Sequence, residues 1–175
     1  MHFQINTTVT AKWARKGSRP KVKSAPGRKS ASYSGYVLPA TGELIVTKPN
    51  WFNFETVIES YREFLAKTCI ADGRKILMVI DNAPWRKKAK RLIWDVCDDE
   101  YADIREKMEV LSLPPYSPDL NPIEQVWRKT RREVTHNRYF KNISELEHTL
   151  DIYFDGFRKP NNELASLCTF KHKYL

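Results

Sequence analysis

Hydrophobic positions in the first half of the chain follow a hairpin pattern and then a helix pattern. Residues 31–49, ASYSGYVLPATGELIVTKP, contain two β-rich runs on either side of PATGE, which predicts a hairpin with a loop of several residues. The next segment starts at Asn53, a residue that can cap a helix, and its apolar residues recur with helical spacing. These residues are Phe54, Val57, Ile58, Tyr61, Phe64, Leu65 and Cys69. We therefore predict a helix with one buried stripe.

The central part of the chain predicts two strands with a helix between them. The run KILMVID contains five consecutive apolar residues, Ile76 to Ile80. A short, unbroken apolar run is typical of a strand that is covered on both faces. A strongly basic, amphipathic helix pattern then begins near Pro84. Residues 108–116, MEVLSLPPY, predict a second short strand that ends at its two prolines.

Two helices are expected in the C-terminal part. Asn121 and Pro122 begin the first, and Ser144 begins the second, with Glu147 three residues later as a capping box. The expected core positions are Ile123, Val126, Trp127, Thr130 and Val134 in the first helix and Leu146, Leu150, Tyr153 and Phe154 in the second. This order of elements predicts a single α/β domain over residues 1–175, in which a mixed sheet carries helices on both faces.

Composition narrows the class of protein. A chain of 175 residues with 41% hydrophobic and 12% aromatic residues is long enough to bury one core. No apolar run approaches the ~20 residues of a membrane span, and the first residues lack the pattern of a signal peptide. Three widely separated cysteines argue against a disulfide framework or a zinc knuckle, and the four histidines lack metal-binding spacing. We therefore expect a cytoplasmic protein without a histidine-bound metal.

The net charge of the chain is +9, and its positive charge is concentrated in residues 1–42, 86–91 and 128–132. Residues 1–42 contain eight Lys or Arg and no acidic residue, and 12–32 read as a flexible loop or arm rich in Gly, Pro and Ser. Clustered cations favour a polyanionic partner such as nucleic acid over a merely solvated surface. The cations that we expect to contact DNA phosphates are Arg15, Lys16, Arg19, Arg86, Lys87, Lys88, Arg128 and Arg131.

Two carboxylates are candidates for chemistry. Asp81 ends the most hydrophobic strand, where catalytic groups gather in open α/β sheets, although an Asp–Asn pair there can also simply form a turn. Glu124 occupies the third position of the helix that begins at Pro122, where a capping-box glutamate is common and contributes ~1 kcal/mol. If the chain returns between them, both carboxylates could face one cleft. Hard oxygen ligands beside phosphate-binding cations suit magnesium-dependent phosphodiester chemistry.

Two blocks carry a resemblance to a known family. VIDNAPW at 79–85 and LPPYSPDLNPIEQVWRKTRRE at 113–133 closely resemble the catalytic domain of DDE transposases, in the bacterial insertion-sequence group related to mariner transposases. Weaker agreement extends through HF, KWARKGSRP and SGYV. The resemblance implies a ribonuclease H-like fold that cleaves DNA at transposon ends and transfers the strand into target DNA. It also implies a homodimer assembled on DNA in the nucleoid.

The resemblance assigns roles to three residues. Asp81 and Glu124 would be the second and third acids of the catalytic triad, and Asn82 would support the metal-binding shell. The implied cofactors are two Mg²⁺ or Mn²⁺ ions, ~4 Å apart, that clamp the scissile phosphate. Trp85 and Trp127 adjoin the two acids, and we expect both to anchor helices in the core.

The chain departs from the family pattern in three ways. The family places its first aspartate in an Asp-Glu pair just before the residues that match His2 and Phe3, whereas no acidic residue here precedes Glu43. Arg86 stands where the family often has histidine, and no helix-turn-helix region precedes the catalytic part. We therefore expect a fragment, half of a frameshifted product or a decayed remnant that binds DNA but is inactive alone. The alternatives are a non-catalytic basic DNA-binding domain and a simple nuclease of ribonuclease H-like fold.

Overall fold

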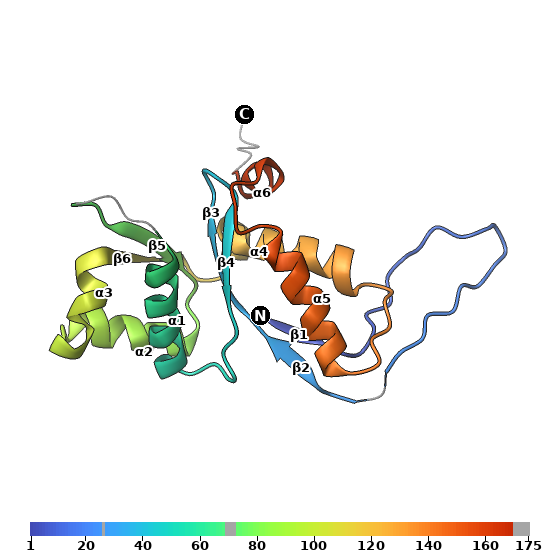
Figure 1. The fold of residues 1–175 in the computed structure, drawn as a ribbon, viewed down its shortest axis with the longest axis horizontal. Coiled ribbons are helices and arrows are strands. Elements are labelled where there is room, and N and C mark those ends of the chain that lie inside the picture. Colours follow the sequence, from blue (N-terminus) through green and yellow to red (C-terminus); the bar gives the residue numbers. More distant parts are fainter. Residues whose placement is uncertain (26, 69–72, 170–175) are drawn as a thin grey trace.

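The computed structural model describes residues 1–25, 27–68 and 73–169, which form six short strands and several helices (Figure 1). The strands are β1 (His2–Gln4), β2 (Ser30–Ser32), β3 (Ser34–Leu38), β4 (Glu43–Thr47), β5 (Ile76–Ile80) and β6 (Met108–Ser112). The α-helices are α1 (Phe54–Lys67), α2 (Pro84–Lys90), α3 (Ala102–Lys107), α4 (Pro122–Thr130), α5 (Ile143–Asp155) and α6 (Asn162–Cys168). π-Helical turns at Arg91–Asp95 and Arg131–Thr135 extend α2 and α4, and 3-10 turns lie at Asp99–Tyr101 and Pro118–Leu120.

The strands pair in three two-stranded ladders. β1 pairs with β2 and β3 with β4, both antiparallel, and the second pair confirms the predicted hairpin. β5 and β6 are parallel, with Ile80 opposite Ser112, so that the residues after both strands emerge at the same edge. The mixed α/β class is confirmed. Within the described residues no ladder joins another, so the prediction of one continuous mixed sheet stays a prediction.

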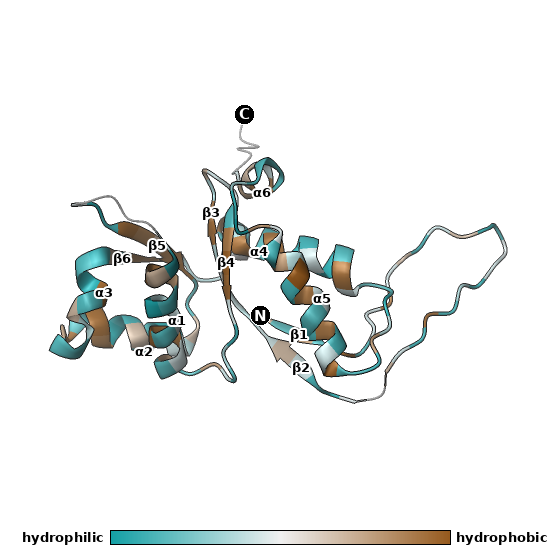
Figure 2. Ribbon diagram, viewed as in Figure 1, coloured by the Kyte–Doolittle hydropathy of each residue, from teal (hydrophilic) through white to brown (hydrophobic). Residues whose placement is uncertain are grey.

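Apolar side chains pack into two separate cores, and both regions are visible as brown segments in Figure 2. The first, which we term the α4 core, joins β1–β4 to α4, α5 and α6. The second, the α1 core, joins β5 and β6 to α1, α2 and α3, and Tyr36, Leu38 and Ile45 of the β3–β4 hairpin pack against it. Gly35 lets β3 approach α4 closely, because a Cβ atom there would lie 2.6 Å from Cη2 of Trp127.

The ends of two helices test the predicted caps. Asn53 caps α1 as predicted, and its side chain accepts the N–H of Thr56 at 2.7 Å; Cys69, the last residue of the predicted stripe, lies outside the described residues. The predicted start of the last long helix at Ser144 is wrong. Asn142 caps α5 by accepting the N–H of Glu145 at 2.9 Å, and it does so because its extended backbone aims its side chain at the first turn.

The prediction that β5 is covered on both faces is also wrong. Met78 and Ile80 are buried in the α1 core, but Leu77 and Val79 on the opposite face are 63% and 40% exposed. The physical reason is that α1, α2 and α3 all pack against the same face of the β5–β6 ladder. The apolar run thus gave the correct element but the wrong number of covered faces.

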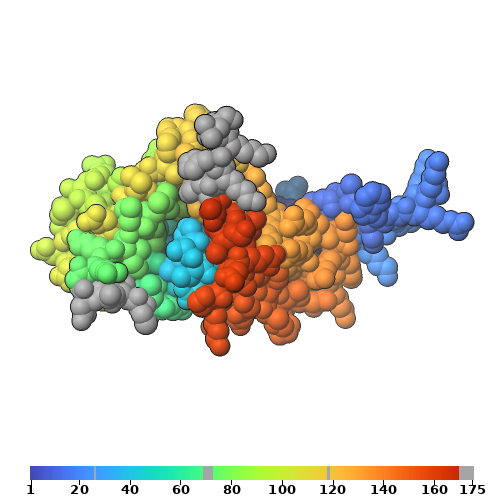
Figure 3. Space-filling view, turned by 90° about the horizontal axis from the view of Figure 1, so that it is seen from above, coloured from blue at the N-terminus to red at the C-terminus, as the bar shows by residue number. Residues whose placement is uncertain are grey.

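Residues 9–29, which we term the basic arm, have no regular strand or helix in the part that the structure describes, and the arm projects from the body (Figures 1 and 3). Its returning end packs against the body, where Ala25 is buried in the α4 core. The predicted loop over 12–32 is therefore confirmed for the described residues up to Lys29, and β2 begins at Ser30. The base of the arm is fixed by a bridge between Thr8 and His136 and by the amide of Asn137, which donates to Thr10 Oγ1 at 3.0 Å. In the described ranges, no helix combines the length and apolarity needed to cross a membrane.

Candidate active site

Asp81 directly follows β5 and uses its two oxygens differently. Its Oδ1 accepts the N–H of Ala83 at 3.0 Å, which stabilises the turn into α2. Its Oδ2 lies 3.3 Å from Nη1 of Arg86, on the first turn of α2. The turn-forming role that an Asp–Asn pair can play is therefore present. It coexists with a half-exposed carboxylate at the end of a strand, where a ligand can reach it.

Glu124 lies on α4 and does not cap it. The side chain of Asn121 makes no capping hydrogen bond, and Glu124 contributes only its backbone N–H to the helix start, donating to the carbonyl of Asn121 at 3.0 Å. Among the described residues, no side chain or backbone group pairs with the Glu124 carboxylate. The capping-box interpretation of Glu124 is thus wrong, and its charge is left for another partner.

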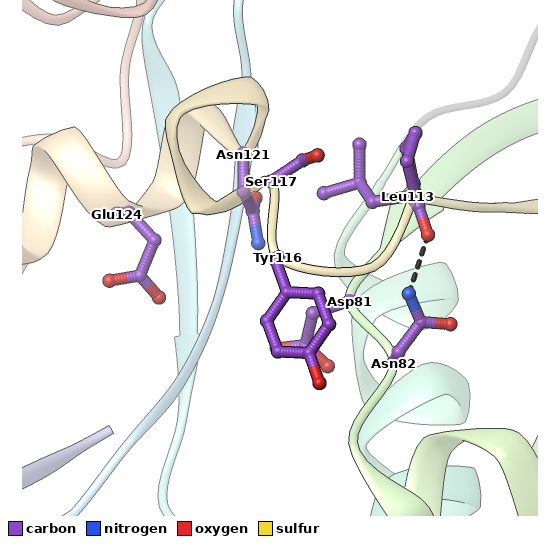
Figure 4. Close-up of a pocket in the computed structure, with 8 residues that line it drawn as sticks. Asp81, Asn82, Leu113, Tyr116, Ser117, Asn121 and Glu124 are labelled. Carbon is purple, nitrogen blue, oxygen red and sulfur yellow. Dashed lines mark hydrogen bonds between the residues drawn. The ribbon is translucent and has the colours of Figure 1, made fainter.

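Asp81, Asn82 and Glu124 line one cavity of about 210 Å³. Figure 4 shows Glu124 projecting from α4 on one side and Asp81 and Asn82 from the end of β5 on the other. The Asn82 amide donates to the carbonyl of Leu113 at 2.5 Å and so ties the end of β5 to the end of β6. The remaining lining residues are Leu113, Pro114, Tyr116, Ser117 and Asn121. The structure therefore brings together three residues for which the sequence suggested a joint role.

Tyr116 is a cavity residue for which the sequence predicted no role. Its side chain is fully exposed, its φ is +58°, and Figure 4 shows its ring between Glu124 and Asn82, with Asp81 behind it. A bulky residue in the left-handed region is strained. The signal that could have found it is its place in the unusual PPYSPDLNP block between the two acids.

The start of β1 borders the same site. The amino group of Met1 donates to the carbonyl of Tyr33 at 2.6 Å. Burial lowers the pKa of this amino group to about 6, as does the charge of Arg86, while Glu124 and Asp81 act in the opposite direction. Met1, Arg86 and the two carboxylates are thus close enough to influence one another electrostatically.

The predicted DNA-binding cations fall into three groups. Arg15, Lys16 and Arg19 are exposed on the basic arm, away from the cavity. Lys87 and Lys88 are exposed on α2, and the Lys88 ammonium lies 3.7 Å from the ring centroid of Phe54.

Arg86 is the predicted cation that contacts a residue of the cavity directly, through its pair with Asp81. Arg131 extends toward Met1, with its Nη2 3.2 Å from the Met1 sulfur. Arg128, one turn after Glu124, instead pairs with Asp119 at 3.1 Å. The predicted phosphate contacts of Arg128 and Arg131 stay a prediction.

The two tryptophans beside the acids differ. Trp127 is 4% exposed and packs edge-to-face against Phe3 and Phe154, which confirms its predicted core position. Trp85 is 37% exposed and stacks on Phe52, with ring centroids 6.0 Å apart. The core prediction for Trp85 is wrong, because the first turn of α2 lies at the surface.

Donor chemistry decides whether a divalent cation suits this cavity. The described residues contain no group of three or more His, Cys, Asp or Glu side chains arranged to hold a metal. The cavity nevertheless offers two carboxylates together with the side-chain oxygens of Asn121 and Ser117. These hard donors fit Mg²⁺ or Mn²⁺, with Asp81 and Glu124 as the charged ligands.

One family profile matches most of the chain. The profile described as DDE superfamily endonuclease matches residues 1–147. The uncharacterized protein y4pE/y4sA of Sinorhizobium fredii is 30% identical over 90 residues, which is 50% of this chain and 58% of that protein. The chain thus spans little more than half the length of this relative.

Solved structures share the fold. The Mos1 mariner paired end complex with Mn superposes with a TM-score of 0.64 at 16% identity, covering 94% of this chain and 48% of that one. The Mos1 strand transfer complex gives a TM-score of 0.61 at 16% identity, covering 94% and 47%. The chain therefore corresponds to about half the length of the Mos1 chains in these complexes.

Proposed function

Because the chain belongs to the DDE superfamily endonucleases, we propose that residues 1–175 are a ribonuclease H-like catalytic domain of a DNA transposase. In this proposal the domain cuts phosphodiester bonds at the ends of an insertion sequence and joins those ends to target DNA. The observation that carries it is the meeting of Asp81 and Glu124 in one cavity. These acids are 43 positions apart and belong to different packed cores, so local structure alone does not account for their meeting.

Asp81 and Glu124 would hold the divalent cations, and Asn82 would keep the end of β5 in place through its hydrogen bond to Leu113. Bound Mg²⁺ or Mn²⁺, as two ions in a complete site, supplies activation of the attacking hydroxyl and stabilisation of the leaving oxygen. The carboxylate of Glu124 is available for this role, since it has no other partner among the described residues. The resulting proposal is a metal-dependent endonuclease and strand-transfer activity.

DNA would lie across the face that carries the cavity. Arg131, two helical turns after Glu124, and the exposed Lys87 and Lys88 on α2 offer phosphate contacts. The basic arm, with Arg15, Lys16 and Arg19, would contact the duplex farther from the cut. Such contacts position the backbone without reading its sequence. Assembly as a homodimer on paired DNA ends is part of the same proposal.

The decisive experiment compares this chain with one that carries an added Asp-Glu pair immediately before Met1. We expect the 175-residue chain to bind duplex DNA in a salt-dependent manner but to cleave it weakly, because its cavity contains two carboxylates. The extended chain should nick DNA in Mn²⁺, and Asp81→Asn or Glu124→Gln should lower that rate by more than about 100-fold. Arg158→Ala, which breaks an exposed pair with Asp155, is the matched control.

Three results would count against the proposal in different ways. Cleavage that survives both Asp81→Asn and Glu124→Gln excludes the assigned ligands. An extended chain that binds DNA but neither cleaves it nor binds Mn²⁺ supports a non-catalytic DNA-binding domain. Cleavage without joining of pre-cut ends that carry a free 3′-hydroxyl supports a simple nuclease.

A further inference from the structure

Arg86 is the cation that contacts a proposed metal ligand directly. Its Nη1 lies 3.3 Å from Oδ2 of Asp81, and Asp81 is its only carboxylate partner among the described residues. The other oxygen of Asp81 already accepts the N–H of Ala83. The carboxylate therefore has both oxygens engaged, whereas that of Glu124 has neither.

Arg86 and Arg105 are the least exposed arginines in the Arg–Asp pairs of the described residues, and Arg105, which is 21% exposed and 4.0 Å from Asp99, also donates to the carbonyls of Ile93 and Asp98. The Arg86 side chain is 20% exposed, while those of Arg62 and Arg128, in pairs with Asp103 and Asp119, are 42% and 56% exposed. A guanidinium removed from water needs an anion nearby, so Arg86 depends on its partner more than the exposed arginines do. Burial raises the pKa values of the partly buried Tyr36 and the buried Tyr61, and the charge of the nearby Arg86 acts in the opposite direction.

A divalent cation and Arg86 compete for the same oxygen. A metal ion on Oδ2 of Asp81 would meet the positive guanidinium at short range, where repulsion between like charges is strong. Binding of the metal thus requires Arg86 to move away from Asp81. Once moved, the guanidinium needs a replacement anion, and a DNA phosphate matches its planar, bidentate hydrogen-bonding geometry.

We propose that Arg86 is an internal counter-ion that passes from Asp81 to a DNA phosphate, so that DNA and a divalent cation bind to this chain cooperatively. This inference rests on the proposed function, because it uses Asp81 as a metal ligand and DNA as the partner. The exposed Lys87 and Lys88, which follow Arg86 on α2, would hold the DNA backbone within reach of the released guanidinium. In the absence of DNA, Arg86 keeps the cation affinity of the site low.

The test is a titration of the full chain with Mn²⁺, followed by electron paramagnetic resonance, with and without a short blunt DNA duplex. Coupling between two ligands is typically about 5- to 150-fold and is reciprocal. We expect DNA to raise the Mn²⁺ affinity of the unchanged chain about tenfold, and Mn²⁺ to raise its DNA affinity, measured by fluorescence anisotropy, by the same factor. The double variant Asp81→Asn, Glu124→Gln with the same duplex measures the Mn²⁺ that the DNA itself binds.

Variants of Arg86 should remove the coupling. Arg86→Gln should bind Mn²⁺ about tenfold more tightly without DNA and gain little when DNA is added. Arg86→His, assayed well above the imidazole pKa of about 6.5, should behave in the same way and provides a second neutral side chain if the glutamine variant folds poorly. Arg158→Ala breaks an arginine–aspartate pair far from the cavity and should match the unchanged chain.

The outcomes separate this inference from the proposed function. If Arg86→Gln and Arg86→His keep the Mn²⁺ affinity and the DNA-dependent gain of the unchanged chain, the counter-ion role is wrong while the proposed metal site stands. If Mn²⁺ binding by the protein is the same in the double variant as in the unchanged chain, the proposed metal site itself is wrong. Tighter Mn²⁺ binding in both Arg86 variants, together with loss of the coupling, supports the inference.

Discussion

The α4 core and the α1 core each supply one acid to the cavity, but they hold it in different ways. Glu124 stands on a helix whose next turn is buried, with Val126 and Trp127 packed among aromatic side chains. Asp81 follows a strand that is covered on one face only, and an ion pair with Arg86 holds its carboxylate. Hydrophobic packing of α4 therefore fixes the position of Glu124, whereas an ion pair with Arg86 fixes that of Asp81.

Removing the large aromatic side chain of the α4 core should have the largest effect. Trp127→Ala is expected to lower the free energy of unfolding by about 3–5 kcal/mol, because Trp127 is almost fully buried beneath β3 and α5. Trp85→Ala, at the surface beside Asp81, should cost about 1 kcal/mol. Urea unfolding followed by circular dichroism measures both values. Equal losses would contradict the difference between the two regions.

Loss of an ion pair should also lower the free energy of unfolding more in the α4 core than in the α1 core. Lys129 is 6% exposed and binds Glu133 at 2.6 Å and Glu163 at 2.5 Å, joining α4 to α6. Lys129→Ala should therefore lower the free energy of unfolding by about 2 kcal/mol, since Glu163 loses its cation and Glu133 keeps only its longer, exposed pair with Arg132.

The matched control for Lys129 is Arg62→Ala in the α1 core. Arg62 makes an exposed pair with Asp103 at 3.0 Å, and its loss should cost about 0.5 kcal/mol. Chemical denaturation of both variants under one buffer condition gives the comparison. If Arg62→Ala lowers the free energy of unfolding more than Lys129→Ala does, ion pairs stabilise the α1 core more than the α4 core.

Acid should weaken the α4 core through Glu133. Burial raises the pKa of this carboxyl group, but hydrogen bonds from Lys129 and Tyr153 outweigh burial and hold the pKa below its usual 4.5. A carboxyl group whose pKa is lower in the folded state contributes stability above its unfolded pKa and loses it as the pH falls through its folded pKa. Unfolding free energies measured from about pH 6 to about pH 3 should thus fall less steeply in Glu133→Gln than in the unchanged chain. If the unfolding free energy falls equally steeply with pH in both proteins, Glu133 does not contribute to the loss of stability in acid.

The smallest effect is expected on the open face of β5. Leu77→Thr places a β-branched residue on an exposed strand position and should change the free energy of unfolding by less than about 0.5 kcal/mol. Leu111→Thr, on the neighbouring strand β6 and also exposed, should behave alike. A loss above about 2 kcal/mol in either variant, measured by thermal unfolding, would show that this face is covered in solution.

Most helices and strands could be predicted from the sequence because turns, helix caps and short apolar runs each depend on adjacent residues. The hairpin around Gly42, the capped start of α1 and the apolar runs of β5 and β6 each depend on a few neighbouring residues. The open face of β5 could not be predicted, because an apolar run does not say how many layers pack against it. The short helix α6 was not predicted at all, since its seven residues show too little periodicity to distinguish from a loop.

The candidate site was predictable in part. The two blocks around Asp81 and Glu124 identified the residues that line the cavity, and the structure placed both there. The pairing of Arg86 with Asp81 required the turn of α2, and the missing cap at Asn121 required the backbone geometry of α4. Both depend on side-chain directions that sequence spacing leaves open.

The segment from Leu113 to Asn121 connects the two parts of the chain that carry the two acids. It leads from the end of β6, beside Asp81, to the start of α4, and Pro114, Pro115 and the left-handed Tyr116 restrict its shape. One inserted residue lengthens a chain by up to about 3.4 Å, close to the ~4 Å between the two ions of a two-metal site. Insertions and deletions of single residues should consequently be tolerated in the basic arm and selected against in this segment. The length of the segment sets the distance between Asp81 and Glu124.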